Sequence, residues 1–271
     1  MSHREPYQRW LNAPQLTECQ RQELAGLSDE EARDRFYRTL SFGTAGLRGL
    51  MGMGLNRMNE YIVRQATDAF AQVILESGQA EKGICICYDC RINSRFFAEE
   101  AAHVMRCRGI PVWLFRDCRP TPQLSFAVRQ FGAAAGINVT ASHNPKEYNG
   151  FKVYGEGGAQ LPTHMADKVA EKMALLDPLA PRPESDSMAS LTWLEEDFDE
   201  QYINAVLQCA IAPEHLAEDA FPIVYTPFHG VGGAIVPEVL RRAGLKHIVF
   251  VEEQMAPDGT FPTVISPNPE D

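Results

Sequence analysis

The sequence has 271 residues, 45% of them hydrophobic and 23% charged, with a formal net charge of −11. Such a composition is typical of one or two ordinary globular domains, and the negative charge argues against nucleic acid as a partner, because that role needs a broad basic surface. No stretch approaches the roughly 18 apolar residues that cross a membrane, and the polar start has no apolar secretory core, so we expect no membrane partner, a cytoplasmic location and seven reduced cysteines.

The beginning of the chain is predicted to be helical and then irregular. Residues 1–40 have helical character, and a capping box from Ser28 to Glu31 precedes an apolar helical stripe. The following stretch, 42–54, contains five glycines and is expected to be a loop or strained turn, since glycine disfavours regular structure. An amphipathic helix is expected after it.

Strands and helices then alternate, which is the pattern of an α/β protein. Strands are expected at 83–88, 112–115, 133–139 and 150–154. Helices are expected at 94–108, from Thr121 onward, and at 163–176. In the second of these helices, Thr121 would be the cap and Pro122 the first helical residue.

The remainder begins with a stretch at 177–190 that is rich in proline and serine, as a linker or domain boundary is. Beyond it we expect a helix at 198–209. A strand–turn–helix–strand unit should follow at 221–251, with Gly244 ending its helix. This unit looks like the start of a second α/β domain.

A reactive serine is predicted in the loop at 140–149. The small-residue strand before this loop ends at Thr140, and ligands gather at the carboxyl ends of strands in open α/β sheets. Ser142 therefore stands where a reactive hydroxyl can be presented, His143 is its neighbour, and Pro145 partly presets the turn. The alternative is a plain turn with a capping serine.

The strand after this loop adds a basic group. Because side chains alternate along a strand, Phe151 and Val153 should share one face and Lys152 the other. Lys152 would then point away from the apolar layer and back toward Ser142. A serine with a neighbouring histidine and lysine suits nucleophilic or phosphoryl chemistry.

Four motifs resemble those of the α-D-phosphohexomutases. The most specific is the phosphoserine signature, in which Lys152 follows Ser142 by ten residues. It reads Thr140-Ala141-Ser142-His143-Asn144-Pro145 and then Tyr148-Asn149-Gly150-Phe151-Lys152. The glycine-rich stretch Phe42-Gly43-Thr44-Ala45-Gly46-Leu47-Arg48-Gly49 resembles the N-terminal loop of the long-form phosphoglucomutase and phosphopentomutase branch. Weaker matches are Tyr88-Asp89-Cys90-Arg91-Ile92-Asn93-Ser94 and Arg119-Pro120-Thr121-Pro122.

The resemblance implies a fold and a domain plan. The expected fold is α/β, with a three-layer α/β/α domain around a mixed sheet and then an incomplete second α/β/α domain. The expected parts are an N-terminal helical extension at 1–40, a phosphoserine domain at 41–180, a linker at 181–195 and the incomplete second domain at 196–271.

It also implies a function, the interconversion of hexose 1-phosphate and hexose 6-phosphate. Ser142 would give a phosphoryl group to the sugar phosphate, forming a bisphosphate, and would then take back the other phosphoryl group. Lys152 would be general acid or base, His143 would position the phosphoryl group, and Arg48 would clamp its oxygens. Thr44 and Asn144 complete the implied phosphate-binding set, listed here as Thr44, Arg48, Ser142, His143, Asn144 and Lys152.

The family holds Mg²⁺ between the serine phosphate and an aspartate-rich loop, and uses a sugar bisphosphate such as glucose 1,6-bisphosphate as activator. This sequence contains no such loop, so Ser142 is its one implied metal contact, and we expect the 271-residue chain to be inactive by itself. Alternatives of the same class are a phosphopentomutase and a glucose 1,6-bisphosphate synthase. From another class, the chain would be a truncated, non-catalytic sugar-phosphate-binding module.

Four other features each have two interpretations. The cysteines at 85, 87 and 90 are core thiols or a zinc site. The stretch from Thr226 to Gly233 builds the second domain or contacts substrate. Acidic residues at 195–200 are a solvated helix start or a metal site. Asp89 and Arg91 are a structural pair or catalytic groups.

Overall fold

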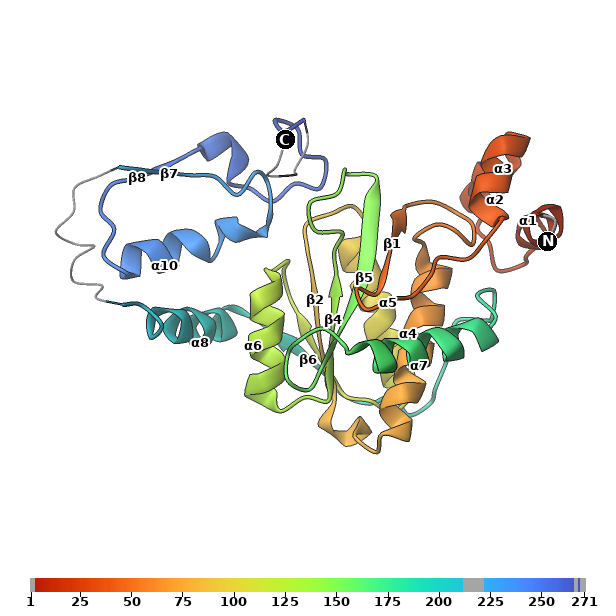
Figure 1. Cartoon of the computed structure of the whole chain (residues 1–271), viewed down its shortest axis with the longest axis horizontal. Helices are drawn as coiled ribbons and strands as arrows, with labels where there is room; N and C mark the ends of the chain where they lie inside the picture. Colours follow the sequence, from red (N-terminus) through yellow and green to blue (C-terminus); the bar gives the residue numbers. More distant parts are fainter. Residues whose placement is uncertain (1–2, 212–221, 266–267, 269–271) are drawn as a thin grey trace.

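A computed structural model describes residues 3–211, 222–265 and 268 of the chain. At its centre lies a six-stranded mixed sheet with the strand order β1-β5-β4-β2-β3-β6 (Figure 1). The strands are β1 (Leu47–Leu50), β2 (Ile84–Tyr88), β3 (Val112–Phe115), β4 (Ala135–Val139), β5 (Tyr148–Gly155) and β6 (Leu191–Leu194). β2, β3, β4 and β6 run parallel, whereas β5 is antiparallel to both β1 and β4.

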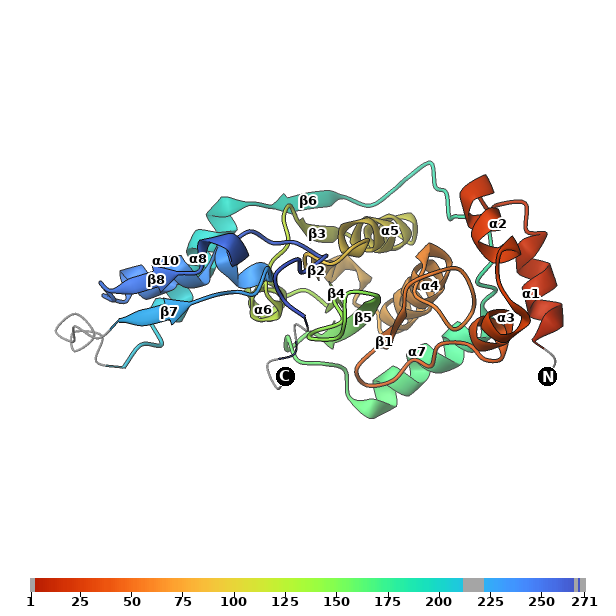
Figure 2. The same cartoon turned by 90° about the horizontal axis from the view of Figure 1, so that it is seen from above.

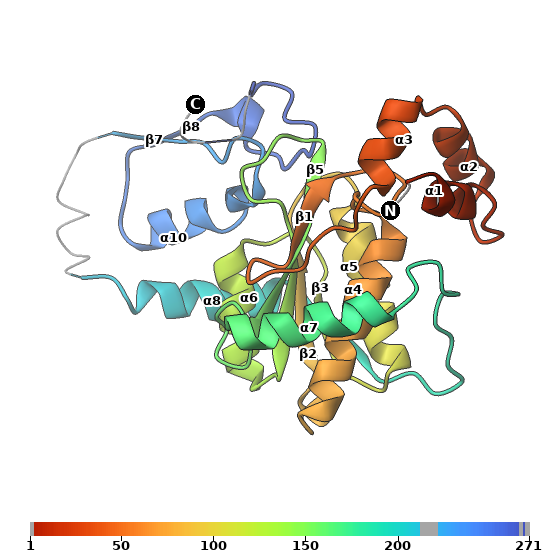
Figure 3. The same ribbon diagram turned by 45° about the vertical axis from the view of Figure 1, so that its right-hand side comes forward.

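Helices cover both faces of this sheet. One face carries α4 (Glu60–Glu76), α5 (Ser94–Cys107) and α7 (Thr163–Leu175), and the other carries α6 (Thr121–Phe131) and α8 (Glu196–Leu207). Figure 3 shows α7 and α4 packed together in front of the sheet. The expected three-layer α/β/α domain is therefore confirmed.

The two cores follow from alternation along the buried strands. In β2, Ile84 and Ile86 pack into the core under α4 and α5, whereas Cys85 and Cys87 pack into the core under α6. Both cysteines are fully buried, as expected for core thiols. Burial raises the pKa of both thiols, which keeps them protonated.

Three short helices precede the sheet and lie at one end of the molecule (Figure 2). They are α1 (Arg4–Leu11), α2 (Glu18–Ala25) and α3 (Asp29–Phe36). The expected capping box between Ser28 and Glu31 begins α3. Trp10 is the centre of their small core, where it meets Phe36 and Tyr61 edge-on, with ring centroids 5.8 and 5.5 Å away.

Two segments expected to be irregular are strands, and one helix cap is shifted. β1 lies within the glycine-rich stretch, because β5 supplies a hydrogen-bonding partner that overrides the local glycine content. β6 lies within the expected linker and pairs with β3, so this segment belongs to the first sheet. Pro120, rather than Thr121, is the cap of α6, and Thr121 is its first residue.

The second part of the chain forms a small βαβ unit, as the sequence predicts. It consists of β7 (Ile223–Tyr225), the 3₁₀ turn Val231–Gly233, α10 (Val236–Arg242) and β8 (Ile248–Phe250), followed by the 3₁₀ turn Glu252–Gln254. β7 and β8 are parallel, and Gly244 follows the helix with a φ of 102°. The beginning of the expected unit, at 221, lies outside the described residues.

Candidate active site

The loop between β4 and β5 holds Ser142 in an unusual backbone conformation. Its φ is 59°, in the left-handed region that non-glycine residues avoid at a cost of roughly 1–2 kcal/mol. Its amide donates to the Thr140 hydroxyl at 2.9 Å, and the Asn144 amide donates to the Ala141 carbonyl at 3.1 Å. The side chain of Ser142 is exposed. A strained, exposed serine at the carboxyl end of a strand is a functional candidate.

His143 and Arg48 both approach this loop. The Ser142 hydroxyl lies 3.5 Å from Nδ1 of His143, which is at the outer limit of a hydrogen bond. An Nη1–H of Arg48 donates to Oδ1 of Asn144 at 2.8 Å. Arg48 reaches the loop because β1 pairs with β5, where it stands opposite Gly150. The strand that the sequence did not predict is thus the element that delivers the cation.

Lys152 lies on the face of β5 that the alternation predicts. Phe151 and Val153 belong to the core under α4 and α5, whereas Lys152 stands beside Asn138 of β4 on the opposite face. Burial, and secondarily the charge of Arg48, lower the pKa of its ammonium below 10.5. A lysine with a lowered pKa gives up its proton more readily than a free lysine, which favours a role in proton transfer.

Thr44 is the one predicted site residue that the structure leaves apart. It lies at the exposed tip of a tight turn, in which Gly43 and Gly46 exchange backbone hydrogen bonds of 3.1 and 2.7 Å. Within the part of the chain that the structure describes, no hydrogen bond joins its side chain to the Ser142 loop. The structure therefore brings together Ser142, His143, Asn144 and Arg48, with Lys152 next to them.

Arg91 is a site residue whose role the sequence did not indicate. It follows β2, which lies beside β4 in the sheet, and its side chain is 1% exposed. It does pair with Asp89, as expected, at 3.3 Å. In addition, its guanidinium donates to four carbonyl oxygens of the Ser142 loop, those of Ser142, Asn144, Pro145 and Tyr148, at 2.6–3.1 Å. The pKa of Asp89 is raised by burial, although hydrogen bonds from Thr140 and Ser94 oppose this.

A cavity of about 400 Å³ opens beside Ser142, between the two parts of the chain. The first part contributes Ser142, His143, Arg91 and Arg119 to its walls, among others, and the second part contributes the turn at 227–231 and Phe261. Asn138 also lines it, and its buried Oδ1 has no hydrogen-bond partner among the described residues. The turn at 227–231 thus lines the same cavity as the serine, as well as belonging to the second part. Arg48 and Lys152 are not among the lining residues.

The acidic run at the start of α8 is not uniformly solvated, which corrects the expectation. Asp199 is partly buried against Arg119, whose Nη2 and Nε lie 2.6 and 2.9 Å from its carboxylate oxygens, and it also accepts from Gln123 at 2.5 Å. Glu195, by contrast, makes an exposed pair with Arg116 at 2.8 Å. Asp199 therefore fastens α8 to the turn before α6.

The described residues do not form a magnesium site by themselves. Among them, no three His, Cys, Asp or Glu side chains converge where they could hold a metal ion. Mg²⁺ prefers six oxygen ligands in octahedral geometry, and a phosphate on Ser142 would supply at most a few of them. Over the same residues, no helix is long and apolar enough to span a bilayer.

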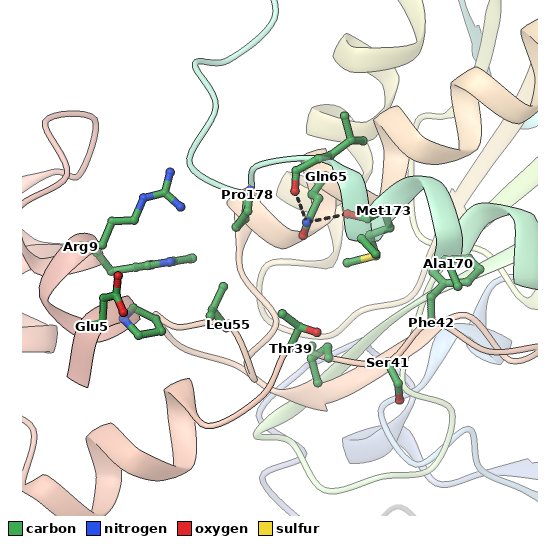
Figure 4. Close-up of a pocket in the computed structure, with 15 residues that line it drawn as sticks. Glu5, Arg9, Thr39, Ser41, Phe42, Leu55, Gln65, Ala170, Met173 and Pro178 are labelled. Carbon is green, nitrogen blue, oxygen red and sulfur yellow. Dashed lines mark hydrogen bonds between the residues drawn. The ribbon is translucent and has the colours of Figure 1, made fainter. Parts of the chain in front are cut away.

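A larger cavity, of about 790 Å³, lies away from this chemistry, between the N-terminal helices and the α4–α7 pair (Figure 4). Its walls are mainly apolar and include Trp10, Leu55 and Met173. Gln65 is fixed at its edge by hydrogen bonds of 3.0 and 2.8 Å to the carbonyls of Met173 and Leu176. None of the Ser142 loop lines it.

The fold and the serine loop define a three-layer α/β domain with a strained, exposed serine at a strand end, and comparison with known proteins identifies its family. Residues 39–178 match phosphoglucomutase/phosphomannomutase α/β/α domain I, and residues 200–271 match α/β/α domain II of the same family. The chain belongs to this family, within the α-D-phosphohexomutase superfamily.

Individual relatives agree with this assignment. A phosphoglucomutase of Staphylococcus epidermidis is 38% identical over 90% of this chain and 45% of its own length. A phosphopentomutase of Mus musculus is 34% identical over 97% of this chain and 44% of its own length. A solved Thermus thermophilus structure, assigned as a phosphomannomutase, superposes with a TM-score of 0.69 at 26% identity, covering 83% of this chain and 48% of that one. The chain thus spans about half the length of the curated relatives that it matches.

Proposed function

We propose that this chain carries the phosphoryl-accepting serine of a phosphosugar mutase that interconverts hexose 1-phosphate and hexose 6-phosphate. The observation that supports this most is Ser142 itself, an exposed hydroxyl whose left-handed backbone is held by hydrogen bonds from Arg91 and to Thr140. Such strain is retained where the surroundings over-determine it, and it presents the hydroxyl to the cavity.

In the proposed reaction, phosphorylated Ser142 gives its phosphoryl group to a hydroxyl of the sugar monophosphate. The bond between phosphorus and Oγ breaks, a bond from phosphorus to the sugar oxygen forms, and the proton of the sugar hydroxyl passes to a base. The resulting bisphosphate turns over and returns its other phosphoryl group to Ser142. Nothing is gained or lost overall, so the phosphoserine is regenerated in each cycle.

The neighbouring residues have separate proposed roles. Lys152, with its lowered pKa, is the general acid or base at the sugar oxygen. His143 positions the phosphoryl group from beside the hydroxyl. Arg48, fixed by Asn144, offers a planar guanidinium to phosphoryl oxygens. Thr44, on its exposed turn, is proposed only as an outer phosphate contact.

Mg²⁺ and a sugar bisphosphate activator such as glucose 1,6-bisphosphate are part of the proposal for the family's full reaction. Among the described residues, no three His, Cys, Asp or Glu side chains lie together as metal ligands. The phosphoryl-transfer steps proposed for this chain are therefore assigned to its own side chains alone. A cytoplasmic setting is also proposed and agrees with the seven cysteines, all of which are free thiols.

A phosphopentomutase is the second candidate, because a phosphopentomutase is among the relatives at 34% identity. Glucose 1,6-bisphosphate synthesis would use the same serine. A non-catalytic sugar-phosphate-binding module remains the alternative from another class, since the chain spans only 44–45% of these relatives. Hexose and pentose phosphates offered in parallel as acceptors distinguish the first two.

The test is direct phosphorylation. The folded chain is incubated with glucose 1,6-bisphosphate and Mg²⁺, and the modified residue is mapped by mass spectrometry. We expect phosphate on Ser142, its loss in Ser142→Ala, and its retention in a control variant, Ser41→Ala, which alters another exposed serine. Absence of label from the folded chain, or equal labelling of Ser142→Ala, would contradict the proposal. Turnover is measured separately with glucose 1-phosphate, and we expect it to lie far below about 10 s⁻¹, the median for enzymes.

A further inference from the structure

We infer that Arg91 is a positioning residue that couples the seating of the second domain to the conformation of the Ser142 loop. The inference rests on the proposed function in one respect only, that the loop conformation matters because Ser142 accepts phosphate. The coupling itself is a property of the fold.

One buried side chain, that of Arg91, holds the Ser142 loop together. Each terminal nitrogen of Arg91 donates two hydrogen bonds. Nη1 donates to the carbonyls of Pro145 and Tyr148 at 2.8 and 3.1 Å. Nη2 donates to the carbonyls of Ser142 and Asn144 at 2.9 and 2.6 Å. A planar guanidinium is the one side chain that can hold four acceptors in a fixed fork. Because the carbonyl of Ser142 is among the four, the orientation of the strained peptide depends on Arg91.

The second domain packs against the same residue. The ring centroid of Phe261 lies 5.5 Å from the guanidinium carbon, on the domain side of Arg91. Gly259 packs so closely that a Cβ there would lie 2.6 Å from the Cys90 carbonyl and 2.8 Å from the Ile92 amide nitrogen. The Cys90 thiol also donates to the carbonyl of His229 at 3.2 Å. The domain contact therefore covers the residues on both sides of Arg91.

Together these contacts make Arg91 the shared member of two assemblies. Its N–H groups donate to the loop carbonyls, and its guanidinium carbon lies over the ring of Phe261, which is a cation–π contact. If the second domain moves away, Arg91 gains solvent and rotamer freedom, and its four loop hydrogen bonds then compete with water. The loop should therefore be ordered when the domain is seated and loosened when it is not.

Hydrogen exchange tests the coupling between the second domain and the Ser142 loop. No phosphoryl donor is needed, so a negative result for the coupling can be told apart from a negative result for the proposed function. Amide exchange is followed in peptides 139–150 and 254–264, with the β2 peptide 84–88 as internal reference. Gly259→Ala should unseat the second domain through its clash with the Cys90 backbone. We expect exchange at least about tenfold faster in 254–264 and also in 139–150, with 84–88 unchanged, as in local opening. Gly157→Ala, which adds a methyl group in open space, is the control.

The second variant is Arg91→Lys, which keeps the charge beside Asp89 but not the fork. It should accelerate exchange in 139–150 alone or together with 254–264, whereas Arg95→Lys, at an exposed pair with Glu99, should change neither. The coupling is overturned if Gly259→Ala loosens 254–264 and leaves 139–150 at the wild-type rate, or if it loosens neither. It is also overturned if folded Arg91→Lys leaves 139–150 protected. If Arg91→Lys does not fold, the Gly259→Ala result decides.

Discussion

At the scale of single residues, the lowered pKa of Lys152 is the property most directly tied to chemistry. Burial and the charge of Arg48 both favour its neutral form. We expect Lys152→Ala to slow phosphorylation of Ser142 by glucose 1,6-bisphosphate by about 10²–10⁴-fold, the usual contribution of a positioned acid or base. Single-turnover rates measured across pH provide the check. If Lys152 is the acid, the wild-type rate should fall as pH rises through a pKa below 10.5, and the variant should lack that limb.

The same pKa predicts how stability depends on pH. Because the folded-state pKa of Lys152 lies below its unfolded value near 10.5, the unfolded chain binds the proton more readily. The contribution of Lys152 to the free energy of unfolding therefore rises with pH between the lowered pKa and 10.5. Lys152→Met removes the cost of burying the charged ammonium. The variant should be at least as stable as wild type at pH 7 and should lose its advantage near pH 10.5, as measured by urea unfolding. A stability difference that stays constant over this range would show that Lys152 is not desolvated.

At the scale of elements, the close approach of β1, β5 and the end of β4 depends on a glycine. A Cβ on Gly150 would lie 2.5 Å from the Thr140 carbonyl oxygen and 2.9 Å from that of Leu47. Both contacts are with backbone, so Gly150→Ala should lower the free energy of unfolding by about 1–3 kcal/mol. Gly157→Ala has open space and should stay within about 0.5 kcal/mol of wild type. Equal effects of the two substitutions in urea unfolding would contradict this account.

The elements also show what a sequence can predict and what it cannot. The expected bounds of β2, β3, β4 and β5 agree with the observed bounds within two residues. Apolar periodicity and the glycines that interrupt it are local signals, so they can be recognised in the sequence alone. β1 and β6 were not predicted, since each is a four-residue edge strand defined by its partner rather than by its composition. The site shows the same division. The sequence predicts Ser142 as the reactive residue and places Lys152 on its observed face of β5, but the contacts of Arg91 with the Ser142 loop depend on β2 lying beside β4, which strand order along the chain does not give.

At the scale of the whole molecule, the attachment of α8 to the first domain should depend on one partly buried ion pair. Asp199 accepts from Arg119 through two nitrogens and from Gln123, and the side chains of the pair are only 11–13% exposed. We expect Asp199→Asn to lower the free energy of unfolding by about 1–3 kcal/mol, because it leaves partly buried donors of Arg119 poorly satisfied. Glu195→Gln alters the exposed pair with Arg116 and should cost less than about 1 kcal/mol. Thermal unfolding of the two variants decides, and a larger effect at Glu195 would refute the ranking.

The strand order has a further consequence, for synthesis on the ribosome. β1 is made early, but its partner β5 emerges about a hundred residues later, with Leu47 opposite Phe151, and chains grow at roughly 5–20 residues per second. For several seconds or more the nascent chain must therefore carry an edge strand with no neighbour. A strand of four residues with a glycine inside it is a poor template for pairing with other chains. The glycines that conceal β1 in the sequence would thus also protect it during translation, until the loop that carries Ser142 turns the chain back and β5 takes its place between β1 and β4.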